Sequence, residues 1–421
     1  MGHTLAEKIL LAHSDADEVA VGDLVMVRCD VVMANDVSGP VAFRAMEEMG
    51  KATVFDPDKV IMVADHFMPA KDAVSAGLQK RLKEWSLKQG VHFFDQGRGG
   101  IEHKVMIEEG FVVPGAVVVG GDSHTCTHGA LGAFGTGLGS TDIACALAFG
   151  EFWQGVPGTI RVNVIGSKRR FVTGKDIILE VLNQIGVAGG TDKVLEFVGP
   201  GAEGLSIDER LAVSNMAVEA GSETGIFPAD AKTAEYLEGR ARTAWEPVRS
   251  DPDAVYAMEL TIDLDRLDPL MAFPHLPGNV EKVADVVGKK IDQVYIGNCG
   301  NGTITDLRQA AEIFRGRQVH QDCRAIIVPA SVAVYKEAMH EGLLDVFADA
   351  GVLVSTPTCG ACFGGGNGVL AAGETALTTT NRNFKGRMGS GEAEVHLANA
   401  WVAAAAAVAG EIVNPEEVVG Q

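Results

Sequence analysis

Three cysteines in the last third of the chain have the types and spacing of metal ligands. Cys359 and Cys362 form a C-x-x-C pair inside the glycine-rich stretch "STPTCGACFGGGNGV" (355–369), and Cys299 lies in "YIGNCGNG". Both segments directly follow apolar runs that predict buried strands. Because two strand ends can meet at one edge of a sheet, the three thiolates could form one site. Three thiolates suit an iron–sulfur cluster that leaves one iron without a protein ligand.

Two other interpretations of the C-x-x-C pair stay open at this point. A redox dithiol normally begins a helix near the amino end of a small thioredoxin-like unit, whereas this pair lies near residue 360 in a loop. A structural zinc site needs a fourth Cys or His at regular spacing, and the chain has no second C-x-x-C. Of the other cysteines, Cys126 is ambiguous, and three are expected to be inert core thiols: Cys29, Cys145 and Cys323.

Asp and His residues follow other apolar runs in pairs. Asp65 and His66 lie in "MVADHFMPA", Asp122 and His124 lie in "GGDSHTCTHG", and His103 lies in "GRGGIEHKV". An Asp beside a His fixes the tautomer and raises the pKa of the imidazole, which suits proton delivery to a leaving group. One such His alone is more often a satisfied loop residue. Three in predicted strand-end loops, together with three candidate thiolate ligands, favour an acid–base site.

Two arginines provide a candidate anion-binding group. Arg382 and Arg387 lie in "TTTNRNFKGRMG" (378–389), and guanidinium groups bind carboxylates through two-point contacts. Without that context, the stretch is typical of a solvated turn. The formal net charge of −21 disfavours non-specific nucleic-acid binding. An anionic substrate therefore needs a local basic pocket.

The composition predicts a cytoplasmic protein. The seven cysteines are an odd number in a long chain without a signal-peptide pattern, which argues against a disulfide framework. The apolar run "LANAWVAAAAAVAGEI" is shorter than the roughly 18 residues that a membrane span needs. We expect it to form a buried helix that stops at Gly410.

Alternating strand and helix patterns must position these residues. Continuous Val/Ile runs joined by helices imply parallel sheets that are covered on both faces. The expected strands cover 59–65, 90–97 and 115–125, and the expected helices cover 71–89 and 139–153.

The 421 residues are too many for one core. We predict an α/β domain over 1–160, a smaller α/β domain over 161–274, and an α/β domain over 275–421 that carries the cluster cysteines. The Pro-rich stretch 268–282 is the best candidate for a linker.

Several motifs together resemble the aconitase superfamily, in particular its large subunits of the 3-isopropylmalate dehydratase and homoaconitase type. The resemblance covers essentially the whole chain. It implies three α/β domains with mostly parallel sheets around a central [4Fe–4S] cleft, with no swivelling domain. It also implies a hydro-lyase in which the open iron acts as a Lewis acid. The motifs, in chain order, are "ADHFMP", "GIEHKV", "GGDSHTCTHGALGAFGTGLGSTD", "SNMAVEAG", "YIGNCGNG", "CGACFGGGNGVLAAGE" and "TNRNFKGRMG".

The resemblance implies roles for individual residues. His66, held by Asp65, would protonate the departing hydroxyl, with a network of further groups around that water and the substrate. The implied catalytic residues are Asp65, His66, His103, Asp122, His124 and Glu219. The implied substrate contacts are Asn35, Ser123, Asn215, Arg382 and Arg387. The implied cluster ligands are Cys299, Cys359 and Cys362.

The resemblance also implies a partner. Single-chain aconitases are longer and carry a swivelling domain that supplies a serine base and a substrate-sorting arginine. We therefore expect a small subunit to supply that domain in a heterodimer or heterotetramer, and we expect this chain to be inactive alone.

Departures from the family pattern leave the substrate open. They are "NCGNG" for S-C-T-N-G, "CGACFGGGNG" for C-G-P-C-L-G-x-x-x-G, and "GIEH" for G-I-C-H. The leading expectation is isomerisation of 3-isopropylmalate. The alternatives are a homoaconitase, or a hydratase of a smaller acid such as dimethylmalate, citramalate or maleate. A non-enzymatic RNA-binding role is disfavoured by the net charge and by the intact Asp–His and Arg sets.

Overall fold

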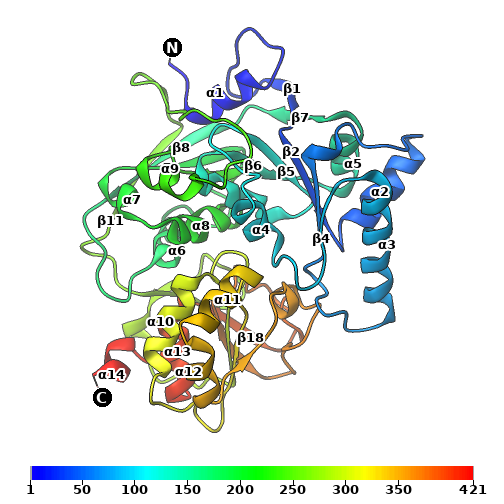
Figure 1. The fold of residues 1–421 in the computed structure, drawn as a ribbon. Helices are drawn as coiled ribbons and strands as arrows, with labels where there is room; N and C mark the ends of the chain where they lie inside the picture. Colours follow the sequence, from blue (N-terminus) through cyan, green and yellow to red (C-terminus); the bar gives the residue numbers. More distant parts are fainter. Residues whose placement is uncertain (1, 421) are drawn as a thin grey trace.

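The computed structural model describes residues 2–420 and arranges them around three main β-sheets (Figure 1). The segments coloured blue to green lie together in the upper part of the view, and the yellow-to-red segment lies below them. The predicted α/β class with mostly parallel sheets is confirmed.

The first sheet is formed by β2 (Val31–Asn35), β3 (Val60–Val63), β4 (His92–Phe94), β5 (Val117–Gly120) and β6 (Phe134–Gly137). All five strands are parallel, in the order β4-β3-β2-β5-β6. Both faces are buried, since Val32 packs into one core and Met33 into the other. This two-sided burial explains the continuous apolar runs. The associated helices are α1 (Leu5–Ala12), α2 (Gly39–Glu48), α3 (Ala73–Gln89), α4 (Glu102–Glu108) and α5 (Ser140–Phe149).

The second sheet is formed by β8 (Gly158–Ile165), β9 (Lys193–Val198), β10 (Thr224–Ile226) and β11 (Met258–Asp263). Its four strands are parallel, in the order β10-β9-β8-β11. Its helices are α6 (Gly174–Ile185), α7 (Pro200–Gly204), α8 (Ile207–Asn215) and α9 (Ala231–Leu237).

The third sheet has seven strands, β12 (Leu270–Ala272), β13 (Val280–Lys282), β14 (Gln293–Ile296), β15 (Arg324–Ile327), β16 (Leu353–Val354), β17 (Thr375–Thr378) and β18 (Glu394–Leu397). The prediction that 268–282 is a linker is wrong, because β12 and β13 lie in this stretch and pair antiparallel at the edge of the sheet. The apolar segment Leu270–Ala272 is buried there. The helices are α10 (Ile304–Phe314), α11 (Val332–His340), α12 (Leu343–Asp349), α13 (Ala400–Ala409) and α14 (Pro415–Val419).

Smaller elements complete the chain. The helix predicted over 139–153 ends earlier, because Gly150 adopts a left-handed conformation (φ 74°) and stops α5 at Phe149. The residues that follow form β7 (Glu151–Gly155), which pairs antiparallel with β1 (Leu24–Arg28). The 3₁₀ turns are η1 (Pro57–Lys59), η2 (Ser123–Leu131), η3 (Ala217–Ala220), η4 (Val283–Asp285) and η5 (Gly360–Phe363).

The predicted C-terminal helix is present as α13, which is buried and is followed by Gly410 (φ 78°). Within residues 2–420, no helix combines the length and the apolar character needed to cross a bilayer. The predicted boundary at 160/161 falls inside β8, and the boundary at 274/275 falls between β12 and β13. The division into three domains stays a prediction.

Candidate active site

The site lies where strand ends of the first and third sheets meet. Asp65 and His66 directly follow β3, and Cys359 follows β16 of the third sheet. The backbone N–H of Cys359 donates to the carbonyl of Asp65 at 3.0 Å, and the Thr358 hydroxyl donates to the same carbonyl at 3.0 Å. The acid-bearing loop and the cysteine-bearing loop are therefore joined directly, although nearly three hundred residues separate them along the chain.

Asp65 and His66 form a buried ion pair. His66 Nδ1 lies 2.6 Å from Asp65 Oδ1. His66 is 8% exposed and Asp65 is 0% exposed. Burial alone would lower the pKa of His66, but the charge and hydrogen bond of Asp65 outweigh it and raise that pKa to about 10. The imidazole is thus protonated at neutral pH. Since Asp65 holds Nδ1, the Nε2 proton is the one available for transfer.

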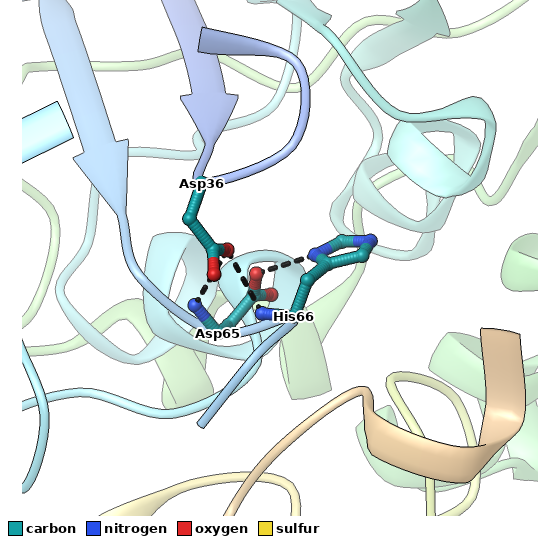
Figure 2. A group of neighbouring side chains, drawn as sticks. All are labelled: Asp36, Asp65 and His66. Carbon is teal, nitrogen blue, oxygen red and sulfur yellow. Dashed lines mark hydrogen bonds and ion pairs between the residues drawn. The ribbon is translucent and has the colours of Figure 1, made fainter. Parts of the chain in front are cut away.

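Asp36 binds the backbone of this pair, as Figure 2 shows. Its Oδ1 accepts hydrogen bonds from the backbone N–H groups of Asp65 (3.2 Å) and His66 (3.0 Å), and its Oδ2 accepts one from Phe67 (3.0 Å). Asp36 is completely buried. The three contacts fix the backbone that carries the acid. The sequence interpretation missed this residue, although its place just after β2 was an available signal.

A second group extends from Asp122. Asp122 Oδ1 lies 3.0 Å from His103 Nε2 and accepts a hydrogen bond from the backbone N–H of His124 at 2.7 Å. Burial would raise the pKa of Asp122, but its hydrogen bonds to the two histidines hold that pKa well below its usual range. His124 Nε2 lies 3.1 Å from Glu219 Oε1, which also accepts a 2.7 Å hydrogen bond from Arg382 Nε. These five predicted positions form one connected network.

The acid pair and this network face each other. His66 Nε2 lies 3.8 Å from Asp122 Oδ2. One nitrogen of His66 and one oxygen each of Glu102 and Asp122 lie within 4.8 Å of one another. Glu102 had been noted only as a departure from the family pattern, and its buried carboxyl is a further group in the site.

Three predicted substrate-contact residues, Asn35, Arg387 and Ser123, lie outside the network around Asp122. Asn35 is 1% exposed, its amide oxygen accepts from Val37 and Ser38, and its Nδ2 donates to Glu102, so it acts on its neighbours. Arg387 donates from Nε to the carbonyl of Cys362 at 3.0 Å. Ser123 is partly exposed at the start of η2.

Cys299 receives two amide donors. Asn215 Nδ2 lies 3.1 Å and Asn381 Nδ2 lies 3.3 Å from its sulfur. Asn298 Nδ2 donates to Asn381 Oδ1 at 2.6 Å, which fixes the Asn381 amide with its NH₂ group toward the sulfur. Such donors suit a thiolate. Gly297 (φ 126°) turns the chain just before this loop, where a Cβ would lie 1.9 Å from Val328 O.

The three predicted ligands lie together. The hydrogen bond from Cys359 lowers the pKa of Cys362 to about 6 against the effect of burial, with Arg387 as a further cause. Burial first, and then Cys362, raise the pKa of Cys299, so ligation there must release a proton. Among the described residues, the three sulfurs do not all lie within 4.8 Å of one another. Three thiolates without a fourth protein ligand suit a cluster that leaves one iron open.

Lys175, another residue that the sequence interpretation missed, lies beside these sulfurs. It is completely buried, and its Nζ donates to the carbonyls of Thr379 (3.0 Å) and Thr380 (2.7 Å). Burial lowers its pKa to about 8, and the nearby Cys362 is the main opposing group. Within residues 2–420, no carboxylate forms an ion pair with it. A buried cation needs an anionic partner, and a thiolate-ligated cluster would provide that charge.

The aconitase family (aconitate hydratase) matches residues 7–290 and 281–410. The chain belongs to the aconitase family. Family membership, predicted from the motifs, is thereby confirmed. It implies an iron–sulfur cluster, and the donor set around Cys299 and Lys175 fits one.

Relatives within the aconitase family match over the full length. The 3-isopropylmalate dehydratase large subunit 2 of Rubrobacter xylanophilus is 69% identical over 421 residues, covering 100% of this chain and 99% of its own. The 3-isopropylmalate dehydratase large subunit of Desulfitobacterium hafniense is 50% identical and covers 100% of each chain. A solved structure, the holo-form of Thermococcus kodakaraensis aconitase X, is 14% identical, with a TM-score of 0.49 over 91% of this chain and 94% of its own.

Proposed function

We propose that the chain is the large, cluster-binding subunit of a [4Fe–4S] hydro-lyase that isomerises 3-isopropylmalate. The names and full-length identity of the relatives support this substrate. The observation that carries the proposal is the direct junction of the Asp65–His66 pair with the cysteine loop through Cys359 N and Asp65 O at 3.0 Å. This junction supports a charged acid beside the candidate ligands.

Cys299, Cys359 and Cys362 would hold the cluster. When bound, the cluster supplies a Lewis acid that polarises the carboxylate and hydroxyl oxygens of the substrate. The amides of Asn215 and Asn381 stabilise the Cys299 thiolate through hydrogen bonds to its sulfur.

His66 is the general acid in this proposal. It donates the Nε2 proton to the departing hydroxyl, and the Asp65 carboxylate accepts a hydrogen bond from Nδ1–H and stabilises the imidazolium before transfer. Asp122 remains ionised because His103 and His124 N–H bind its Oδ1. Its other oxygen faces His66 Nε2 at 3.8 Å and can accept a hydrogen bond from the water that forms.

Arg382 and Arg387 are the proposed carboxylate-binding residues. Each is anchored through Nε, Arg382 to Glu219 at 2.7 Å and Arg387 to the carbonyl of Cys362 at 3.0 Å. No hydrogen bond from their terminal nitrogens to another residue is present within the described part of the chain. The terminal nitrogens therefore remain for a two-point contact with substrate.

A small subunit would complete the site in a heterodimer or heterotetramer. The relatives are named large subunits, which supports such a partner for this chain. We propose that the partner supplies the base that abstracts the substrate proton, and that the complex works in the cytoplasm.

The test is co-expression with a small subunit, anaerobic cluster reconstitution and an assay with separate substrates. We expect turnover of 3-isopropylmalate by the complex and none by this chain alone. Preferred turnover of homoaconitate, dimethylmalate, citramalate or maleate would replace the proposed substrate. A colourless, iron-free complex, or full activity of the isolated chain, would contradict the proposal.

A further inference from the structure

Glu102 is held rigidly at the junction of the first and third sheets. Its side chain is 1% exposed. The backbone N–H of Ile101 donates to the carbonyl of Ala330 at 2.8 Å, and a Cβ on Gly100 would lie 2.4 Å from the Cα of Ser331. The loop before Glu102 thus lies directly against the loop between β15 and α11, which fixes the position of this side chain.

Within residues 2–420, only one oxygen of the Glu102 carboxyl has a hydrogen-bond partner. Its Oε1 accepts a hydrogen bond from Asn35 Nδ2 at 2.8 Å. The Asn35 amide cannot be reversed, because its Oδ1 accepts from the backbone N–H groups of Val37 and Ser38, both at 2.9 Å. Glu102 Oε2 is buried and has no hydrogen-bond partner among residues 2–420.

The surroundings of Glu102 favour its neutral form. Its backbone N–H donates to Asp65 Oδ2 at 2.8 Å, and Asp122 is the other nearby carboxylate. Burial, followed by these two negative charges, raises the pKa of Glu102 well above its usual range, with the His66 charge acting in the opposite direction. Because Oε1 accepts from Asn35, the proton belongs on Oε2. A buried Oε2–H without an acceptor is unfavourable, so it needs a group that enters the site.

The spacing of His66, Glu102 and Asp122 has the dimensions of one oxygen atom's hydrogen-bond shell. One atom each of His66, Glu102 and Asp122 lie within 4.8 Å of one another. Three atoms that each lie about 2.8 Å from one central oxygen are separated by up to about 4.8 Å.

We propose that Glu102 is a catalytic residue whose neutral carboxyl donates a hydrogen bond from Oε2 to the oxygen of the departing hydroxyl. The proposal rests on the proposed hydro-lyase function. As the C–O bond breaks, its electron pair leaves with oxygen, which takes the Nε2 proton of His66 to become water. Glu102 keeps its proton, and Asp122 accepts a hydrogen bond from the new water. Rehydration reverses these steps, so the same three groups hold the water in both halves of an isomerisation.

The test compares Glu102→Gln with Glu102→Ala in the reconstituted complex with its small subunit. Glutamine keeps an oxygen for Asn35 and places an N–H donor where Oε2–H stands, so we expect kcat close to wild type. Alanine removes the donor, and we expect a loss of about 10²-fold in kcat, typical for one donor to developing negative charge on oxygen. KM should change little, since the contact strengthens as the bond breaks.

Glu108→Gln is the matched control, because Glu108 lies on the same helix and binds Ser331, away from the acid pair. It should keep wild-type kcat. Iron content and circular dichroism must match wild type in all three variants. A loss with Glu102→Gln as large as with Glu102→Ala would mean that Glu102 acts as an ionised base, and normal turnover of Glu102→Ala would mean that it has no catalytic role.

A second measurement separates this inference from the proposed function. Infrared spectra of the resting complex should contain a protonated-carboxyl stretch that Glu102→Gln removes. Absence of that band in the wild type would overturn the inference. Inactivity of the wild-type complex toward every hydroxy acid would defeat the proposed function, and the band would still decide whether Glu102 carries the proton.

Discussion

The two halves of the site are organised differently. On the first sheet, Asp36 accepts hydrogen bonds from three backbone N–H groups, and Asp65 binds both the His66 imidazole and the Glu102 backbone. We call Asp36, Asp65 and His66 the acid side. On the third sheet, burial and then Cys362 raise the pKa of Cys299, and beside it the buried Lys175 of α6 lacks a carboxylate partner within the described chain.

We call Cys299, Cys359, Cys362 and Lys175 the sulfur side. The acid side has opposite charges already paired, whereas the sulfur side has a buried positive charge and sulfurs that become favourable together only when an anionic group is bound. In the proposed mechanism, the chain thus builds its proton-transfer groups into the fold and leaves its electrophile to a cofactor. Loss of the cofactor should therefore leave the acid side intact.

The largest effect is expected from replacing a proposed ligand. Cys299→Ser, Cys359→Ser and Cys362→Ser should each lose the cluster, with activity of the complex falling to background. Iron and sulfide per chain and the visible absorbance measure the loss. Cys323→Ser is the control, since Cys323 is a buried thiol in a separate hydrophobic core. Full iron content in all three ligand variants would mean that the sulfur side binds no cluster.

Removal of the His66 imidazole should abolish acid catalysis without affecting iron binding on the sulfur side. His66→Ala should keep its iron but lose about 10²- to 10⁴-fold in kcat, the range for general acid catalysis. His340→Ala, an exposed histidine on α11, is the control. Rates are measured in the reconstituted complex, with iron determined on the same samples. Near-normal turnover of His66→Ala would remove its role, and loss of iron would show that the two sides depend on each other.

The Asp36→Asn variant tests whether the Asp36 carboxylate fixes the backbone that carries Asp65 and His66. In Asp36→Asn, the amide NH₂ group meets backbone N–H donors, so at least one of them loses its acceptor at a cost of about 1–3 kcal/mol. We expect a lower thermal midpoint and a kcat reduced by about tenfold, as a displaced acid misses the near-attack geometry. The surface variant Asp345→Asn on α12 is the control. An unchanged midpoint and kcat would show that the Asp65–His66 pair needs no support from Asp36.

On each side, the sequence predicted some residues and missed others. Asp65, His66 and Cys299 were found because small polar residues and cysteines after apolar runs mark the ends of parallel strands, and the structure places those ends together. Asp36 was missed because its place just after β2 marks only a strand end, whereas the backbone groups that it binds lie about thirty residues away. Its role depends on the pairing of β2 with β3, which only the folded sheet defines.

Lys175 could not have been found from its surroundings in the sequence. It lies in "TGKD", where Thr173 and Asp176 form a capping box, and a lysine in the first turn of a helix is ordinarily solvated. Its burial comes from the packing of α6 against the loop after β17. The linker error has a similar origin, because Pro-rich composition at 268–282 gives no sign that a three-residue segment adds to a distant sheet.

The smallest effect on turnover, and the sharpest test of the comparison, is expected from Lys175→Met. Methionine has a similar length and no charge, so the variant loses two hydrogen bonds to Thr379 and Thr380, worth about 0.5–1.5 kcal/mol each. It also avoids burying an ammonium group, which costs several kcal/mol when no partner is present. The cluster-free variant should therefore have a thermal midpoint equal to or above that of the cluster-free wild type.

With the cluster bound, the order should reverse, because the wild-type ammonium then faces an anionic group and the methionine does not. The gain in midpoint on cluster reconstitution should be smaller in Lys175→Met, and iron should be lost to a chelator faster than from the wild type. Lys336→Met, an exposed lysine on α11, should change neither quantity. A variant destabilised equally in both states would show that Lys175 only ties α6 to the carbonyls of Thr379 and Thr380. In that case, the unpaired charge of Lys175 would not contribute to cluster binding on the sulfur side.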